Sequence, residues 1–193
     1  MIFVTVGAQM PFDRLVRTID SWAEANRDAA LFAQIGPGAY RPRHIPSAAR
    51  LDPVEFRQRL FDADLVVTHA GMGTIITALE FARPIVVMPR RADLHETRND
   101  HQLGTAKAIR HARRVTVAWD EQELLTWLDR RKTIPSPQRI TSHASFQLLR
   151  TLRNFIRPGE APPATAPGTT TPSRTEGGER SFAAEDSDRR KAA

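Results

Sequence analysis

Short apolar runs rich in β-branched residues alternate along this chain with segments of helical periodicity. The segments between the runs place apolar side chains three and four residues apart, on one face of a helix. This alternation predicts an α/β fold, a Rossmann-like parallel sheet with helices on both faces. The predicted strands are Ile2–Val6, Leu31–Ile35, Leu65–Val67, Ile85–Met88 and Val115–Val117, with Ala48–Leu51 as a doubtful sixth.

Helix boundaries follow from capping signals as well as from periodicity. Asp52 before Pro53 is a typical N-cap followed by proline at the first helical position, and Asp120 is a second N-cap candidate. The predicted helices cover Phe12–Trp22, a segment from Pro53 to Phe61, Ile75–Phe81, Asn99–His111, a segment after Asp120 that contains Leu124, Leu125 and Leu128, and Gln147–Ile156.

The composition changes at Pro158. From there on the chain is rich in Pro, Thr, Ala, Gly and Ser, and Phe182 is its only large apolar residue. Such a segment buries too little apolar surface to offset the entropy of ordering. We therefore expect one domain over residues 1–157 and a disordered tail over residues 158–193.

Composition and charge exclude several functions. The chain has no cysteine, which excludes disulfides and thiolate metal sites, and no apolar run near the roughly 20 residues that span a bilayer. The start of the chain lacks a basic leader, so we expect a cytoplasmic protein. The net charge of +6 suits a polyphosphate ligand, an anionic membrane, an acidic partner or nucleic acid. A single tyrosine, Tyr40, and the absence of interleaved aromatic and basic residues disfavour nucleic acid.

The segment Thr68–Thr74 reads Thr-His-Ala-Gly-Met-Gly-Thr and joins a predicted buried strand to a predicted helix. Glycines let the backbone approach a ligand, and the free N–H groups of a helix N-terminus face an anion. The turn therefore predicts a phosphate site, most simply for a nucleotide. In parallel sheets the ligand binds at the carboxyl ends of the strands. Four loops should meet at that edge: Gly7–Pro11, Gly36–Tyr40, His69–Thr74 and Pro89–His101.

The longest of these loops, Pro89–His101, is polar and charged, which is typical of functional loops. His95, Glu96 and His101 raise the possibility of zinc. Zinc-binding histidines on a helix stand four residues apart, whereas these stand six apart, so we expect no metal site.

Four segments together resemble the C-terminal domain of family 28 glycosyltransferases, the nucleotide-sugar half of the two-domain GT-B fold. They are Ile2–Gly7, Phe12–Val16, His69–Thr74 and Asn99–Gln102. The resemblance covers roughly residues 1–155. Single-domain members look most similar: the catalytic half of the split dolichol-linked N-acetylglucosaminyltransferase and, above all, the bacterial exopolysaccharide subunit.

The resemblance implies roles for individual residues. Gly71, Met72, Gly73 and Thr74 would hold the donor diphosphate, and Gly7 and Asp100 would also bind the donor. His101 and Gln102 would contact hydroxyls of the transferred sugar, as an alternative to merely capping a helix.

Other assignments are less direct. His69 would bind a phosphate or the sugar, or is a buried histidine bonded to backbone. Arg90 and Arg91 would neutralise the leaving diphosphate. Glu96 would bind a hydroxyl or assist proton transfer, or is an exposed charge paired with Arg98 or Arg90. Many members hold the ribose with a glutamate where this chain has Thr77, whose hydroxyl replaces a carboxylate only in part.

The implied function is the donor-binding subunit of an inverting, metal-independent UDP-sugar glycosyltransferase that uses no cofactor. A membrane-associated partner would bind a lipid-linked acceptor and supply the general base, His69 and Glu96 being the only candidates in this chain. The subunit would then lie at the inner face of the membrane through that partner. A homodimer is an alternative way to cover the surface around the cleft that the partner would otherwise cover. The alternative is a non-catalytic nucleotide-binding accessory module. A dinucleotide-binding oxidoreductase is disfavoured because the turn Gly7–Pro11 lacks a full Gly-x-Gly-x-x-Gly.

Overall fold

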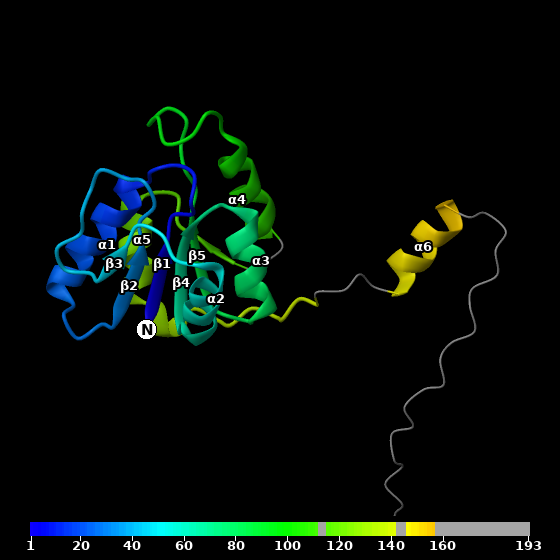
Figure 1. Cartoon of the computed structure of the whole chain (residues 1–193), viewed down its shortest axis with the longest axis horizontal. Helices are drawn as coiled ribbons and strands as arrows, with labels where there is room; N and C mark the ends of the chain where they lie inside the picture. The colour runs from blue at the N-terminus through cyan, green and yellow to red at the C-terminus, as the bar shows by residue number, and fades with distance from the viewer. Residues whose placement is uncertain (112–114, 142–145, 157–193) are drawn as a thin grey trace, which may run out of the picture. The chain divides into compact units, whose positions relative to one another are not determined.

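The structure is a computed structural model that describes residues 1–111, 115–141 and 146–156. The chain divides into two compact units, Met1–Ala144 and Ser145–Ala193. The first unit contains a six-stranded sheet with the order β3-β2-β1-β4-β5-β6 (Figure 1). The strands are β1 (Ile2–Thr5), β2 (Leu31–Gln34), β3 (Ser47–Ala48), β4 (Leu65–His69), β5 (Ile85–Met88) and β6 (Thr116–Val117).

Every strand pair is parallel, which confirms the predicted sheet. The sixth strand is the two-residue edge strand β3 at Ser47–Ala48, which shares only Ala48 with the doubtful prediction Ala48–Leu51. The helices of the first unit are α1 (Asp13–Ala25), α2 (Pro53–Asp62), α3 (Met72–Glu80), α4 (His101–His111) and α5 (Glu121–Asp129), with a short 3₁₀ turn at Arg131–Thr133 that the sequence did not predict.

Two apolar cores lie on opposite faces of the sheet. Because successive side chains of a strand point to opposite faces, Val4, Val67 and Val86 pack against α1 and α5. Phe3, Val66 and Val87 point the other way, toward α2, α3 and α4. The chain is therefore the predicted Rossmann-like α/β domain with helices on both faces (Figure 1).

The capping predictions are confirmed at two helices. The Asp52 carboxylate accepts hydrogen bonds from the backbone amides of Val54 and Glu55, and that of Asp120 from Glu123. The helix predicted at Ile75–Phe81 begins earlier, at Met72, directly after the N-cap Gly71. Gly73 thus lies inside the first turn of α3, where its backbone amide has no intrahelical partner.

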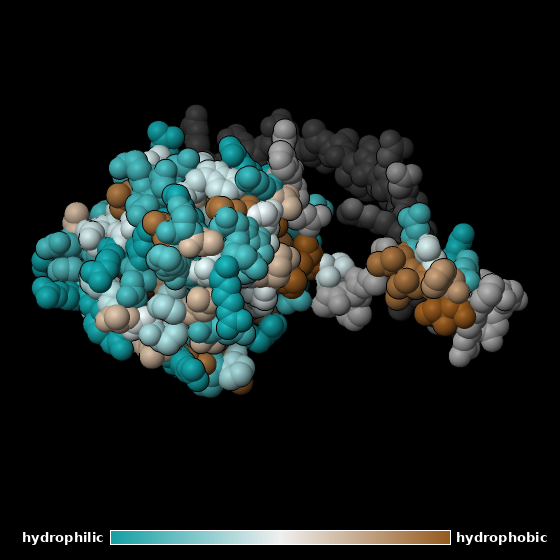
Figure 2. Space-filling view, turned by 90° about the horizontal axis from the view of Figure 1, so that it is seen from above, coloured by the Kyte–Doolittle hydropathy of each residue, from teal (hydrophilic) through white to brown (hydrophobic). Residues whose placement is uncertain are grey.

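The second unit contains helix α6 (Phe146–Ile156), close to the predicted Gln147–Ile156. Its apolar side chains are exposed (brown in Figure 2), and its charged residues are Arg150 and Arg153. None of the helices in the described ranges is long and apolar enough to cross a membrane. The predicted disordered tail, residues 158–193, lies outside the described residues, and the domain boundary at 157 stays a prediction.

Candidate functional site

The turn between β4 and α3 leaves the N-terminus of the helix uncapped. Gly71 is the N-cap and has no side chain to accept a hydrogen bond, and the first turn carries no acidic residue. The first backbone N–H groups of α3 are therefore available to an anion, and the helix dipole favours one there. A Cβ built on Gly73 would meet no atom within 4 Å. Folding alone does not require glycine at position 73, whereas close approach of a ligand would.

The position of the His69 ring explains why two other residues of the predicted site, Gly7 and Gly71, are glycines. A Cβ on Gly7 would lie 2.7 Å from Cε1 of His69, and a Cβ on Gly71 would lie 2.1 Å from its Nε2. Gly7 also has a φ of 78°, which favours glycine. The imidazole thus lies between the β1–α1 and β4–α3 turns. In the structure both glycines make room for the histidine ring, and their contact with the donor stays a prediction.

The same packing keeps His69 neutral. Burial, reinforced by the nearby positive charge of Arg90, lowers the pKa of His69 to about 4, although a hydrogen bond with the Thr5 backbone acts in the opposite direction. At neutral pH the ring can donate a hydrogen bond to a phosphate or a hydroxyl, but it contributes no positive charge. With so low a pKa it is also a weak general base.

Gln102 joins the glycine turn to the end of β5. The residue is 5% exposed, and its side-chain Oε1 accepts hydrogen bonds from the backbone amides of Ala70 at 3.2 Å and Arg90 at 3.1 Å. The amide group therefore fixes two ligand loops relative to each other. Its Nε2 makes no hydrogen bond within the described part of the chain, and its contact with a sugar stays a prediction.

Arg90 fixes the β1–α1 loop to the end of β5 at the same edge of the sheet. It is 4% exposed, and its Nη2 donates to the carbonyl oxygens of Val6 at 2.7 Å and Met10 at 2.6 Å. These bonds hold the β1–α1 loop against the end of β5. Burial lowers the pKa of Arg90 to about 10, so the guanidinium remains cationic at neutral pH. The Arg91 side chain instead pairs with Asp93 at the exposed tip of the loop. Contact of either arginine with a diphosphate stays a prediction.

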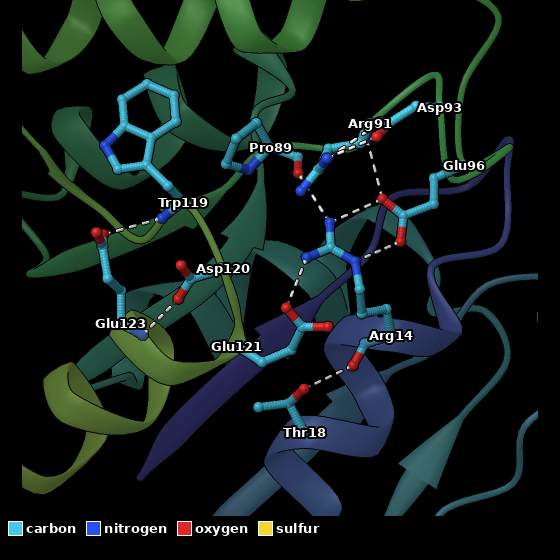
Figure 3. A network of polar contacts seen from close by, with 10 residues as sticks. All are labelled: Arg14, Thr18, Pro89, Arg91, Asp93, Glu96, Trp119, Asp120, Glu121 and Glu123. Atoms are coloured by element: carbon cyan, nitrogen blue, oxygen red, sulfur yellow. Dashed lines mark hydrogen bonds and ion pairs between the residues drawn. The ribbon is translucent and has the colours of Figure 1, made fainter.

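Glu96 differs from the sequence interpretation in both partner and environment. Of the two interpretations of Glu96, the exposed charge paired with Arg98 or Arg90 is wrong, because its side chain is 10% exposed and pairs with Arg14 of α1 (Figure 3). Contact of Glu96 with a sugar hydroxyl stays a prediction. The separation of 82 positions hid this contact from sequence reasoning. Because both carboxylate oxygens accept hydrogen bonds from Arg14, Glu96 is a poor candidate for proton transfer.

The remaining predicted residues lie at the same edge but in different settings. The Thr77 hydroxyl donates to the carbonyl oxygen of Gly73 at 2.9 Å, one turn earlier in α3. Asp100 is exposed and accepts from the Ala92 amide at 3.1 Å. His101 is exposed at the start of α4, with its amide and its ring bonded to Asn99. Thr77, Asp100 and His101 thus keep surfaces that a ligand can reach.

Two residues that fix these loops were missed. Asp13 accepts hydrogen bonds from the amides of Ala39 and Tyr40 and so ties the β2–β3 loop to α1. Arg14 ties α1 to the β5–α4 connection. Both belong to the segment Phe12–Val16 that contributed to the family resemblance, which was the available signal. No group of three or more potential metal ligands occurs among the residues that the structure describes.

Comparison with known proteins decides the family. Residues 1–130, about two thirds of the chain, match the glycosyltransferase family 28 C-terminal domain. The chain belongs to this family. The matched range contains every predicted site residue, and the observed sheet agrees with the GT-B half expected for the family.

Individual relatives agree with this assignment. The human UDP-N-acetylglucosamine transferase subunit ALG13 is 30% identical over 118 residues, which cover 56% of this chain and 10% of the relative. The mouse protein of the same name is 31% identical over 117 residues, which cover 55% of this chain and 10% of the relative. The matched region is thus about a tenth of these relatives' length. Among solved structures, the solution structure of ALG13 has a TM-score of 0.52 at 19% identity, covering 77% of this chain and 93% of that one. The glycosyltransferase of kitacinnamycin also has a TM-score of 0.52 at 19% identity, covering 68% and 34%. These two likenesses concern the fold.

Proposed function

We propose that this chain is the donor-binding subunit of an inverting UDP-sugar glycosyltransferase that needs no metal ion. The observation that carries the proposal is the uncapped N-terminus of α3 with open space above Gly73, inside a family 28 domain. The diphosphate accepts hydrogen bonds from the backbone amides of Met72, Gly73 and Thr74. The helix dipole stabilises the negative charge that develops on the leaving UDP.

The other loops complete the donor site. His101 and Gln102 contact the transferred sugar, with Asp100 beside them. His69 donates a hydrogen bond from its neutral ring to a phosphate or a hydroxyl of the donor. Arg90, which is buried near His69, contributes positive charge. The ribose has no carboxylate partner at Thr77, whose hydroxyl proton is already donated to Gly73, so Thr77 can only accept a hydrogen bond from it.

A second subunit supplies the acceptor site and the general base. Neither His69, with its lowered pKa, nor Glu96, with its two oxygens bonded to Arg14, suits the role of base. Apolar side chains of Met72 and Leu94 are exposed near the turn and the long loop, as expected of a surface that a partner covers. The relatives named as transferase subunits support a heteromeric enzyme. We place the partner at the membrane, where it binds a lipid-linked acceptor.

A non-catalytic accessory module is the second candidate. The intramolecular bonds of Gln102 and Arg90 favour it, because groups assigned to the donor also hold the fold together. Turnover of the complex reconstituted with the partner separates the two. Catalysis predicts that Gln102→Glu, which keeps the acceptor oxygen, removes turnover while the partner still binds. Unchanged turnover would favour the accessory role.

Donor binding is tested by calorimetric titration of the purified chain with UDP, ADP, NAD and a panel of UDP-sugars in the presence of EDTA. The proposal predicts heat of binding for UDP and for one UDP-sugar, and none for ADP or NAD. Strict dependence on Mg²⁺ or Mn²⁺ would contradict it.

A further inference from the structure

Arg14 stands at the centre of a polar network that spans four segments of the fold (Figure 3). Its guanidinium forms a two-pronged pair with Glu96, Nε to Oε1 at 2.6 Å and Nη2 to Oε2 at 2.8 Å. The same group reaches the carboxylate of Glu121 at the start of α5 at 3.2 Å and the carbonyl oxygen of Pro89 at 3.3 Å. One side chain of α1 thus contacts α5 and both halves of the β5–α4 connection.

The pair with Glu96 is well suited to hold a loop in place. Paired guanidinium and carboxylate groups are planar, so two parallel hydrogen bonds fix orientation as well as distance. The side chains are only 13% and 10% exposed, which limits screening by solvent. Burial acts to lower the pKa of Arg14, but the hydrogen bonds and charges of Glu96 and Glu121 outweigh it and raise that pKa.

The backbone beside Glu96 is strained. His95 has a φ of 56°, in the left-handed region that residues other than glycine rarely adopt. Oε2 of Glu96 also accepts a hydrogen bond from the Arg91 amide at 3.0 Å, which closes the loop upon itself. Strain of this kind persists only where surrounding contacts fix the conformation. The contacts of Glu96 with Arg14 and Arg91 provide that fixation.

The loop held in this way leads directly into the expected sugar contacts, His101 and Gln102, at the start of α4. Pro89 and Arg91, which the network holds, flank Arg90, whose backbone amide donates to Gln102. Gln102 in turn bonds the Ala70 amide in the glycine turn. A continuous set of bonds therefore leads from Arg14 to the two loops assigned to the donor.

We propose that Arg14 and Glu96 are positioning residues that lock the loop over residues 89–100 in the geometry required to bind the UDP-sugar donor. The proposal rests on the proposed function for the identity of the ligand, but not for the locking itself. Neither residue touches the reacting atoms. Their effect on the donor passes through the backbone of the loop and through Gln102.

Two conservative variants test the proposal in the full chain. Glu96→Gln keeps the shape but removes the charge, and Arg14→Lys keeps the charge but removes the planar fork. Hydrogen exchange followed by mass spectrometry should show faster exchange over residues 89–100 in both variants and little change in the strands. UDP affinity by calorimetry should fall by about tenfold or more, because the bonds that run from the loop through Gln102 to Ala70 also position the glycine turn that holds the diphosphate.

Two control variants separate locking from general stability. Glu55→Gln breaks the Arg59–Glu55 pair on α2, away from the loop, and should change neither readout. Asp129→Ala removes the bond from the Trp22 indole and should lower the melting temperature without selective exchange in the loop. The double variant Arg14→Lys/Glu96→Gln should bind UDP no more weakly than the weaker-binding single variant, because both substitutions break the same Arg14–Glu96 pair.

Each outcome has a defined meaning. Loop exchange at the wild-type rate in both variants would overturn the lock, as would a loss of UDP affinity no larger than that in an equally destabilised Asp129→Ala. A wild-type chain that binds no UDP would refute the proposed donor role, while the exchange data would still decide whether Arg14 and Glu96 lock the loop.

Discussion

The imidazole of His69 lies so close to Gly71 that a Cβ at that position would fall 2.1 Å from Nε2. The first glycine of the turn therefore serves a neighbouring side chain, and the second, Gly73, faces open space. The two glycines therefore occupy their positions for different physical reasons, Gly71 for the packing of His69 and Gly73 for the access of a ligand. Substitution at each should separate folding from ligand binding.

Alanine at these positions should give opposite results. Gly71→Ala forces His69 or the turn to move and should destabilise the protein by about 1–3 kcal/mol, as overpacking does. Gly73→Ala should leave stability unchanged or raise it by up to about 1 kcal/mol, because alanine favours helix. It should nevertheless weaken UDP binding about tenfold, or ~1.4 kcal/mol, because the methyl group occupies space next to the diphosphate. Urea unfolding and calorimetry measure both effects.

The double variant Gly71→Ala/His69→Ala provides the control. Removal of the ring should recover much of the stability that Gly71→Ala loses. Equal destabilisation by Gly71→Ala with and without His69 would show that the ring is not the reason for the glycine.

The lowered pKa of His69 should make stability depend on pH. The unfolded chain binds a proton near pH 6.5, whereas the native ring does so only near pH 4. Between these values the unfolded state holds more protons, so the free energy of unfolding should fall as pH decreases from 6.5 to 4, by about 1–3 kcal/mol from this group. Urea unfolding of the wild type and of His69→Asn across this range measures the difference. Parallel pH profiles would contradict the assigned pKa.

Gln102 should show separate structural and ligand effects. Gln102→Ala leaves the buried amides of Ala70 and Arg90 without an acceptor and should cost about 1–3 kcal/mol of stability. Gln102→Glu keeps both bonds and should fold more stably than Gln102→Ala, but it replaces the amide nitrogen assigned to the sugar. UDP should therefore bind Gln102→Glu normally while the UDP-sugar loses its added affinity. Equal loss for UDP and UDP-sugar would refute the sugar contact.

Thr77→Val tests whether the hydroxyl holds the ribose. That hydroxyl already donates to Gly73, so it offers the ribose only an acceptor. We expect UDP affinity to fall by about twofold to threefold, less than the ~1.4 kcal/mol of a tenfold change. Calorimetric titrations with UDP and with free diphosphate are compared, and the difference between them measures the contribution of the nucleoside to the binding affinity. Unchanged affinity for both would exclude Thr77 from ribose recognition.

The fold was predictable because its signals are local. The apolar runs and helical spacing identify the strands and helices, and Asp52 and Asp120 mark helix starts that the structure confirms. The start of α3 was placed three residues late because Met72 and Gly73 look like turn residues rather than helix. The apolar pattern becomes clear only at Ile75.

The site was predictable in position but not in its contacts. Parallel strands bring their carboxyl ends together, so the four loops could be placed at one edge from the sequence. Which partner a charged residue takes depends on the tertiary structure. Arg14 and Glu96 lie 82 positions apart, and no local pattern connects them. The double role of Gln102 and the tight fit of His69 also depend on backbone geometry that periodicity does not encode.

An NMR titration of the ¹⁵N-labelled chain with UDP in the presence of EDTA tests donor binding most directly. We expect the largest amide shifts at Met72, Gly73 and Thr74, and much smaller shifts with ADP. Shifts concentrated away from the start of α3, or no shift at any residue, would contradict the claim that this chain holds the donor diphosphate.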